Sequence, residues 1–331
     1  MTRILVTGGA GYVGAVSVAA LVDAGHAVMV LDDLTTGHAA AVPAGATLHR
    51  GSYTDEASVR SLLVAGRIEA ILHCAARSLV GDSIRNPATY YRENVGGGIA
   101  LLEAARQTGV QRFVFSSTAA VYGTPDETPI PEDAPLRPIN PYGETKRTLE
   151  TALDWYGRAY GMRSVTLRYF NVAGATDAIG EDHDPETHLI PNVLKAAEGG
   201  PPLTVFGDDY PTPDGTCVRD YIHVSDLADA HLLAIEATAP GNTRTDRALV
   251  CNLGNGDGFS VREVLHATAR LTGHDVPHAI GPRREGDPPV LVASAQRAGE
   301  TLDWRPKRPS LDEIIGSALE WRRRNPRGYR N

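Results

Sequence analysis

The chain has 331 residues, 42% hydrophobic and 22% charged, which is ordinary for a globular protein with a large buried core. Its formal net charge of −8 argues against nucleic acid or an anionic membrane as a partner. No apolar run approaches the ~18 residues of a membrane-spanning helix, so we expect no membrane association.

Short apolar strands alternate with helical patterns in the first half of the chain. The predicted strands lie at residues 3–7, 27–31, 70–74 and 112–116. Helices are predicted after the first strand, to about residue 24, and from residue 97 to residue 108. This alternation is typical of an α/β fold with a doubly wound parallel sheet. The first strand follows the start of the chain directly, and we expect no signal peptide.

Two domains are expected from the length and from this pattern. We predict an NAD-binding Rossmann domain over residues 1–175 and a smaller α/β substrate domain over residues 176–331. Residues 218–240 read as a helix that crosses back to the first domain.

The turn after the first strand contains Gly8, Gly11 and Gly14 in the spacing G-x-x-G-x-x-G. Glycines permit a tight turn, and the helix that follows offers free N–H groups and a positive dipole end to a pyrophosphate. Asp32 ends the second strand about 20 residues further on, as in dinucleotide-binding units. Asp32 is expected to bond the adenine ribose hydroxyls. With Asp33 it would repel a 2′-phosphate, which favours NAD over NADP.

Hydroxyl side chains, from Ser116 to Thr118, end the strand at 112–116, on the side of the sheet where ligands bind. Tyr142 and Lys146 are four residues apart, which on a helix puts them on one face. We expect the ammonium to lower the pKa of the phenol, normally about 10, and so allow general-base work near neutral pH. Thr118 would hold a substrate hydroxyl while Tyr142 removes its proton.

Together these residues resemble the extended short-chain dehydrogenase/reductase family. Longer stretches narrow the resemblance to the UDP-glucose 4-epimerases within it, and they are found at 7–14, 116–123, 167–171, 215–224, 283–287 and 302–329. The resemblance implies an isomerase of galactose metabolism that interconverts UDP-galactose and UDP-glucose through a 4-keto sugar, with tightly bound NAD. It also implies a cytoplasmic homodimer, formed through helices near residues 92–108 and 141–160.

The resemblance assigns catalysis to Tyr142 as base, to Lys146, which would hold the cofactor ribose and lower the pKa of Tyr142, and to Thr118. The cofactor-binding positions that it implies are Gly8, Gly11, Tyr12, Val13, Gly14, Asp32, Asp33, Ser52, Tyr53, Cys74, Ala75, Ala76, Ser78, Asn94, Ser116, Tyr142, Lys146 and Tyr169. The implied substrate-binding positions are Thr118, Tyr142, Asn171, His188, Leu189, Val205, Phe206, Arg219, Tyr221, Arg284, Asp287 and Leu291.

The second half of the chain would anchor the nucleotide. In the family, positions matching Asn171, Arg219 and Arg284 contact the diphosphate, to which the arginine fork is well suited. The uridine would be held by Val205, Phe206 and Asp287. The sugar itself must be bound loosely, because it has to turn over between the two hydride transfers.

Four positions depart from the usual family pattern. Ser52 stands where an aspartate meets the adenine, and Ser78 replaces a lysine near the nicotinamide. His188 replaces an asparagine that binds the nucleotide. Leu291 lies at a position that gates substrate size, where tyrosine excludes N-acetyl sugars and a small residue admits them. We therefore expect a preference for UDP-glucose and UDP-galactose, with some turnover of UDP-GlcNAc and UDP-GalNAc.

Three alternatives remain open at this stage. The first is an epimerase of another UDP-sugar, such as UDP-xylose or UDP-arabinose, because the motifs do not fix the substituent at carbon 5 of the sugar. A sugar-nucleotide dehydratase would need an acid directly after Thr118, where Ala119 and Ala120 stand. A catalytically silent NAD-binding sensor would keep NAD but turn over no UDP-sugar.

The three cysteines are far apart and lack metal-ligand spacing. They are Cys74, Cys217 and Cys251. This usage fits a reducing compartment and argues against a disulfide framework. We expect no metal site.

Overall fold

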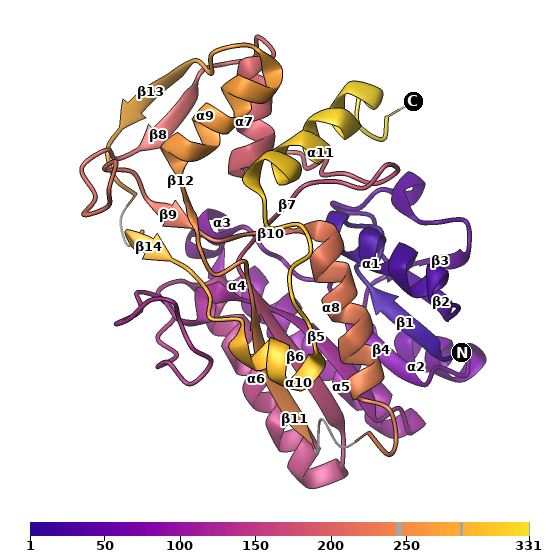
Figure 1. Ribbon diagram of the computed structural model, residues 1–331. Helices are drawn as coiled ribbons and strands as arrows, with labels where there is room; N and C mark the ends of the chain where they lie inside the picture. The colour runs from indigo at the N-terminus through magenta and orange to yellow at the C-terminus, as the bar shows by residue number, and fades with distance from the viewer. Residues whose placement is uncertain (243–246, 285–286, 331) are drawn as a thin grey trace.

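A parallel sheet of seven strands organises the chain, as the computed structural model of residues 1–242, 247–284 and 287–330 shows (Figure 1). The strand order is β11-β6-β5-β4-β1-β2-β3. The strands are β1 (Arg3–Thr7), β2 (Ala27–Asp32), β3 (Ala46–Arg50), β4 (Ala70–His73), β5 (Arg112–Thr118), β6 (Arg163–Tyr169) and β11 (Ala248–Leu253). This sheet confirms the predicted doubly wound α/β class. Its order reverses between β1 and β4, and ligands bind beyond the carboxyl ends of strands at such a point.

Both faces of the sheet are buried under helices. In β1, Ile4 and Val6 belong to a core on one face, whereas Leu5 belongs to a core on the other. Helices α1 (Tyr12–Asp23) and α8 (Val224–Ala237) cover the first face. The other face is covered by α2 (Glu56–Ala65), α5 (Gly98–Thr108) and α6 (Pro141–Tyr160). Strands buried on both faces read as continuous apolar runs, and this made β1, β2, β4 and β5 predictable.

Three strands of the sheet were not predicted. β3 is an edge strand that contains only half-buried and exposed residues, so its apolar signal is weak. β6 contains the buried polar residues Ser164, Thr166 and Arg168. β11 comes late in the chain and pairs in parallel with β6.

The helix predicted at residues 218–240 is shorter than expected. It is α8, which begins at residue 224, because residues 218–219 and 221–223 form the short strands β9 and β10. Its apolar side packs on the large sheet, with Leu227, Ala230 and Ala234 in the same core as β1. Two segments beyond residue 175, α8 and β11, therefore belong to the architecture of the large sheet.

A second core lies among helices and small sheets from the later part of the chain. The helices are α7 (Leu189–Ala197), α9 (Val261–Thr272) and α11 (Leu311–Arg324). The strands are β8 (Leu203–Phe206) paired with β13 (His278–Gly281), and the three-stranded set β12 (Phe259–Ser260), β9 (Val218–Arg219) and β14 (Val290–Leu291). Val193, Val264 and Ile314 are fully buried where the three helices meet.

Short elements connect these two parts. β7 (Asn171–Ala173) pairs in parallel with β10 (Tyr221–His223). The remaining helices are η1 (Ala39–Ala41), α3 (Val80–Arg85), α4 (Pro87–Tyr90), the π-helix η2 (Tyr91–Gly97), η3 (Ala119–Val121) and α10 (Gln296–Leu302).

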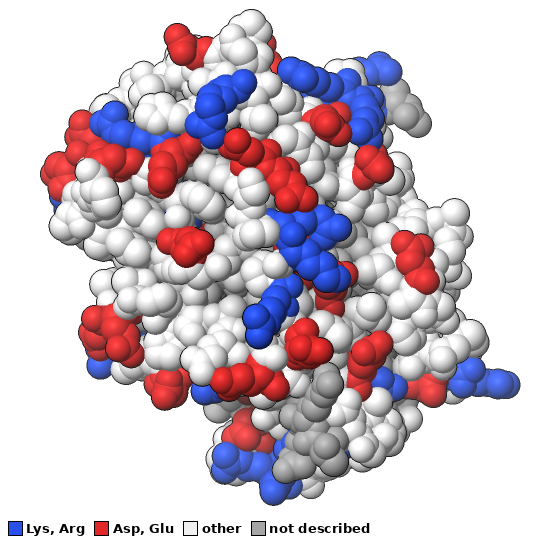
Figure 2. Space-filling model, viewed as in Figure 1, with Lys and Arg blue, Asp and Glu red and all other residues white. Residues whose placement is uncertain are grey.

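On the face drawn in Figure 2, acidic and basic side chains are interspersed. Across the three described ranges, no helix is long and apolar enough to cross a membrane.

Candidate active site

Tyr142 and Lys146 lie in the first turns of α6, as their spacing predicted. Pro141 opens this helix, and the side chain of Asn140 caps it by accepting a hydrogen bond of 2.8 Å from the amide of Gly143. Tyr142 is 8% exposed and Lys146 is 3% exposed. The ammonium nitrogen lies 5.9 Å from the centre of the phenol ring. A cap and a proline therefore fix the start of the helix that carries both groups.

The expected lowering of the pKa of Tyr142 is not what this structure shows. Burial raises the pKa of Tyr142 to about 12, and a hydrogen bond with the Thr118 side chain acts in the opposite direction. Burial also lowers the pKa of Lys146 to about 8, although Cys74 and Glu150 counteract it. Desolvation penalises the charged form of both groups, so it opposes the ion-pair effect that the sequence suggested.

Thr118 is the last residue of β5 and lies at its carboxyl end. Its hydroxyl accepts a hydrogen bond of 3.2 Å from the amide of Ala120, and it lies close enough to the phenol to lower the pKa of Tyr142. The structure thus brings the predicted strand-end hydroxyl to the predicted tyrosine. A substrate hydroxyl that bonds both groups would have a direct route for its proton.

Ser116, which is buried, links Lys146 to other polar side chains. The ammonium donates a hydrogen bond of 2.8 Å to the backbone carbonyl of Ser116. The hydroxyl of Ser116 pairs with a ring nitrogen of His231 at 2.9 Å and with the thiol of Cys74 at 3.3 Å. Burial raises the pKa of the nearby Tyr169 phenol well above its ordinary value, and the Ser116 side chain acts in the opposite direction. Ser116 therefore joins two other predicted cofactor-site residues, Lys146 and Cys74.

The glycine turn follows β1 and leads into α1. A Cβ on Gly8 would lie 2.6 Å from the amide nitrogen of Ala75, and one on Gly14 would lie 2.0 Å from the carbonyl oxygen of Gly8. A Cβ on Gly11 would meet nothing nearer than 3.4 Å. Gly8 and Gly14 are thus required by packing, whereas Gly11 leaves open space on the outside of the turn.

The first turn of α1 fits a dinucleotide phosphate. Gly11 caps the helix without a side-chain hydrogen bond, and the first turn holds no acidic residue. The amides of Tyr12, Val13 and Gly14 therefore start the helix with no side-chain acceptor from the cap. Free N–H groups beside open space are the usual anion site of this fold.

Asp32 ends β2 and is 8% exposed. Its carboxylate accepts hydrogen bonds from the amides of Ala10 at 3.0 Å and Leu34 at 2.8 Å. Burial raises its pKa, and these amides act against that rise. A carboxylate has about four acceptor positions, so two remain for a ribose. Asp33 is exposed and accepts a bond from the amide of Thr35.

The other predicted cofactor positions surround the ends of β3 and β4. The Asn94 side chain is buried and fixes the loop at residues 75–78, because it bonds both the amide and the carbonyl of Arg77. The Tyr53 hydroxyl donates to the carbonyl of Glu93, and the Ser52 hydroxyl pairs with Thr54. Ser78 is exposed. These residues border the same edge of the sheet as the glycine turn, where β4 lies beside β1.

Several predicted substrate residues come together on the three-stranded sheet. Arg219 of β9 stands in register with Leu291 of β14 and forms a salt bridge with Asp287. Leu291 packs against the cluster that contains Ala119 and Phe170, directly after Thr118. Leu291 thus lies between the expected nucleotide anchors and the catalytic strand end.

Val205 and Phe206 lie on β8 next to the expected diphosphate arginine. The guanidinium of Arg284 is 4.0 Å from the centre of the Phe206 ring, while Val205 is buried in the second core. Tyr221 is also buried. Glu285 and Gly286, which belong to the motif at 283–287, lie outside the described residues.

His188 is the N-cap residue of α7 and precedes Leu189. Its Nδ1 atom lies 2.8 Å from a carboxylate oxygen of Glu181 and 2.8 Å from one of Glu186. Burial lowers the pKa of His188, but these carboxylates outweigh it and raise the pKa to about 10. The predicted nucleotide contact is thus already engaged by two acids. Asn171, by contrast, is exposed, and its backbone amide bonds the Asp220 carbonyl.

Two charged residues to which the sequence analysis gave no role lie beside Ser117, the residue before Thr118. Arg168 of β6 forms a buried salt bridge of 2.6 Å with Glu150 of α6 and donates to the hydroxyl of Tyr122. Glu150 also accepts a hydrogen bond from Ser117. Glu150 is one turn beyond Lys146 on α6, so this spacing was the available signal.

Comparisons with known proteins agree over the whole chain. The sequence model of the NAD dependent epimerase/dehydratase family matches residues 4–251. The UDP-glucose 4-epimerase of Streptomyces lividans is 52% identical over 330 residues, which cover 99% of this chain and 98% of that protein. The structure of the UDP-glucose 4-epimerase of Brucella ovis in complex with NAD has a TM-score of 0.93 at 46% identity, with 96% of this chain and 98% of that chain covered.

A second similar structure contains both the dinucleotide and the nucleotide ligand. The UDP-glucose 4-epimerase of Bifidobacterium longum in complex with NAD⁺ and UDP has a TM-score of 0.92 at 36% identity, with 99% of this chain and 100% of that chain covered. The family model runs from within β1 to within β11 and so includes at least part of every strand of the large sheet. This chain therefore belongs to the NAD dependent epimerase/dehydratase family and, within it, to the UDP-glucose 4-epimerases.

Proposed function

We propose that this protein is an NAD-dependent UDP-glucose 4-epimerase, an isomerase that interconverts UDP-galactose and UDP-glucose through a 4-keto sugar. The observation that carries the proposal is the placement of the buried Tyr142, in the first turn of α6, beside Thr118 at the carboxyl end of β5. It lies in a chain that matches an epimerase over its full length. In a buried site of this kind, proton transfer and sugar inversion proceed away from bulk water.

Tyr142 is the proposed base that takes the proton from the 4-hydroxyl of the sugar and later returns it. Thr118 holds the same hydroxyl and orients it toward the phenol. Burial favours the neutral phenol, so a nearby positive charge is needed to stabilise the phenolate. Lys146 supplies such a charge from the same helix face. A positioned acid or base contributes about 10²–10⁴-fold to a rate.

The glycine turn and Asp32 are the proposed holders of NAD. The turn offers the amides of Tyr12 and Val13 to the pyrophosphate, and Gly11 leaves the space that this group requires. Asp32 accepts from the adenine ribose with the oxygen positions left by its two backbone amides. NAD, when bound, supplies a reversible hydride acceptor for carbon 4 of the sugar and a positive charge that favours the phenolate.

Firm nucleotide binding and loose sugar binding are both required for inversion. We propose that Arg219, Arg284 and Asn171 bind the diphosphate and that Asp287 reaches the ribose. Before UDP binds, Asp287 neutralises Arg219, so the ligand diphosphate takes over part of this ion pair. The uracil side is formed by Val205 and Phe206, with His188 and Leu189 at the start of α7.

The first experiment is a chromatographic assay. The purified protein is incubated with UDP-galactose without added NAD, and UDP-glucose is quantified, with Tyr142→Phe as the matched control. We expect conversion by the wild type and near-complete loss in the variant. Absence of conversion even with added NAD would overturn the proposal and direct the search to other UDP-sugars, beginning with UDP-xylose.

We further propose a homodimer formed through α5 and α6, with the chain working in the cytoplasm. Trp155 and Tyr160 of α6 are 60% and 49% exposed, so a partner subunit packed on this helix would bury two aromatic side chains of the kind enriched at interfaces. Three free cysteines fit a reducing compartment. Light scattering after gel filtration tests the dimer, because Trp155→Glu should give a monomer.

We also propose two domains. Their division differs from the one predicted at residue 175, because two later segments belong to the large sheet. The proposed NAD domain comprises residues 1–175 together with α8 and β11, which pack on or extend the large sheet. The proposed UDP-sugar domain comprises the remaining elements around α7, α9 and α11. Limited proteolysis with and without UDP tests this division, since the ligand should protect the segments that join the domains.

A further inference from the structure

Two histidines and two glutamates converge between β7 and α7. They are Glu181, His183, Glu186 and His188, and each offers one atom to a group in which all atoms lie within 4.8 Å of one another. The residues follow the pattern E-x-H-x-x-E-x-H in a loop. The four donors therefore come from one short segment that folds around a single point.

The two imidazoles aim the same atom at the carboxylates. The Nδ1 atom of His183 is 3.1 Å from an oxygen of Glu181 and 4.0 Å from an oxygen of Glu186. The Nδ1 atom of His188 is 2.8 Å from both acids. In a tetrahedral zinc site with bonds of about 2.0–2.1 Å, neighbouring donors are about 3.4 Å apart. The observed separations lie on both sides of this value, so small side-chain movements would complete the geometry.

The chemistry of the donor set also fits a divalent cation. Once an ion displaces the proton of His188, two carboxylates with two neutral imidazoles carry two negative charges, which one divalent ion neutralises. Imidazole nitrogen with carboxylate oxygen in fourfold coordination suits zinc, whereas calcium and magnesium require more oxygen ligands. We propose that Glu181, His183, Glu186 and His188 form a structural site for one Zn²⁺ ion. This proposal departs from the expectation of no metal site, which rested on cysteine spacing and did not consider histidine and glutamate.

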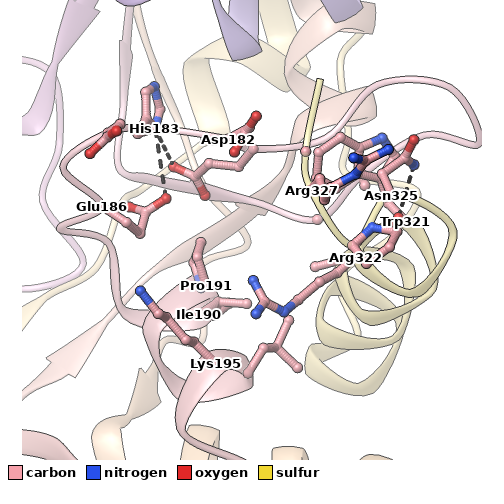
Figure 3. Close-up of a pocket in the computed structure, with 18 of the residues that line it drawn as sticks. Asp182, His183, Glu186, Ile190, Pro191, Lys195, Trp321, Arg322, Asn325 and Arg327 are labelled. Atoms are coloured by element: carbon pink, nitrogen blue, oxygen red, sulfur yellow. Dashed lines mark hydrogen bonds and ion pairs between the residues drawn. The ribbon is translucent and has the colours of Figure 1, made fainter. Parts of the chain in front are cut away.

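An entry route for the ion lies beside the cluster. A cavity of about 390 Å³ is lined by Glu181, His183 and Glu186 on one side and by α11 and the C-terminal residues on the other. In Figure 3, His183 and Glu186 lie side by side at one end of this cavity, with Arg322 and Arg327 on its far side. The cavity thus connects the cluster with solvent.

The site would join the two cores of the protein. His183 lies edge-on to the ring of Tyr12 in the first turn of α1, with 6.5 Å between ring centres. The backbone carbonyl of Asp182 bonds His38, which follows the turn after β2. At its other end the segment caps α7 through His188. A zinc ion at this point would brace the loop between the glycine turn and the helix that begins with Leu189.

The test is the zinc content and Co²⁺ spectrum of the full chain. Protein stripped with a chelator is loaded with ZnCl₂, passed through gel filtration and assayed for metal by mass spectrometry. Zinc affinity is then measured by competition with a chromophoric chelator. The variants are His183→Gln and Glu186→Gln, and the matched control is His274→Gln, an exposed histidine outside the cluster. Circular dichroism of the metal-free proteins checks that each variant is folded.

We expect one zinc per chain in the wild type and in the control, with affinity at least ~10-fold lower in each cluster variant. Co²⁺ should give the intense visible absorption of fourfold coordination in the wild type. Zinc that is absent after gel filtration, or retained equally by both cluster variants, would overturn the proposal. If the variants do not fold, a wild-type Co²⁺ spectrum typical of six water ligands would overturn it alone. Neither result depends on epimerase activity.

Discussion

The ammonium of Lys146 donates a hydrogen bond of 2.8 Å to the backbone carbonyl of Ser116, and this contact ties α6 to the carboxyl end of β5. The same serine pairs through its hydroxyl with His231 under the sheet. The lysine is therefore held by the strand whose last residue, Thr118, acts on the pKa of Tyr142. Helix and strand are fixed relative to each other at the point where the proposed proton transfer takes place.

Replacing Lys146 with methionine should lower kcat/KM for UDP-galactose by at least ~100-fold. The apolar side chain keeps the length of lysine but removes both the charge that favours the phenolate and the bond to Ser116. Steady-state kinetics measures the loss. Lys146→Arg should not restore activity, because the wider planar fork does not fit a site that is 3% exposed.

The matched control for this prediction is Lys307→Met, which removes a lysine whose ammonium bonds Asp229 at the surface. Its activity should equal that of the wild type. Equal activity of Lys146→Met and Lys307→Met would mean that the charge at residue 146 has no part in the reaction.

Two glycines of the turn should respond differently to alanine. Gly14→Ala brings a Cβ to 2.0 Å from the Gly8 carbonyl, so we expect a loss of several kcal/mol of folding free energy or no soluble protein, as for other steric overlaps. Gly11→Ala meets no atom nearer than 3.4 Å and has an extended backbone that alanine adopts. The Gly11→Ala protein should unfold near the wild-type temperature, but its NAD content after purification should be at least ~10-fold lower.

Thermal unfolding and the NAD content of the purified proteins measure both effects. Gly25→Ala is not a suitable control because its φ is +81°, whereas Gly316→Ala lies in open space on α11 and should change neither quantity. A Gly11→Ala protein that keeps full NAD would show that the open side of the turn is not where the pyrophosphate binds.

His231 should make the protein sensitive to acid. Burial lowers its pKa to about 3, below the ordinary 6.5, so its stabilising effect is complete above pH 6.5 and is lost as pH falls toward 3. In that window the unfolded chain binds a proton that the folded chain excludes, which costs up to ~1.4 kcal/mol per pH unit. The free energy of unfolding, measured with urea between pH 6 and 4.5, should therefore depend less steeply on pH in His231→Gln. The difference in slope corresponds to about one proton.

The change in slope is diagnostic, because losing the bonds to Ser17 and Ser116 shifts the stability at every pH by a similar amount. His274→Gln serves as the control, since this histidine is exposed and should leave the slope unchanged. An unaltered slope in His231→Gln would mean that the buried ring is protonated in the folded state.

Leu291 should set the preference between plain and N-acetylated sugars. It packs beside Ala119 and Phe170, next to the proposed catalytic hydroxyl, so a larger side chain would occupy room for an N-acetyl group. Leu291→Tyr should lower the ratio of UDP-GalNAc to UDP-galactose turnover by ~10-fold or more, and Leu291→Ala should raise it. If the ratio is the same in all three proteins, the gate lies elsewhere.

The features that the sequence predicted correctly depend on residues close together in the chain. The spacing of Tyr142 and Lys146 required only a helix, and the glycine turn required only a strand followed by a helix. Strands buried on both faces appear in the sequence as continuous apolar runs, and these runs predicted β1, β2, β4 and β5. Local sequence was sufficient because backbone geometry fixes these relationships whatever surrounds them.

The electrostatic state of the site was decided by the tertiary structure. The sequence paired Lys146 with Tyr142 and suggested a lowered pKa, but burial under neighbouring elements raises the pKa of Tyr142 to about 12. Desolvation depends on everything packed around a group and cannot be read from spacing. The ion pair of Arg168 with Glu150 joins two different elements, and the pairing of the edge strand β11 with β6 joins segments distant in the chain. Sequence alone determined which groups the helix and turn carry, and the packing of the whole chain determined their charge and their partners.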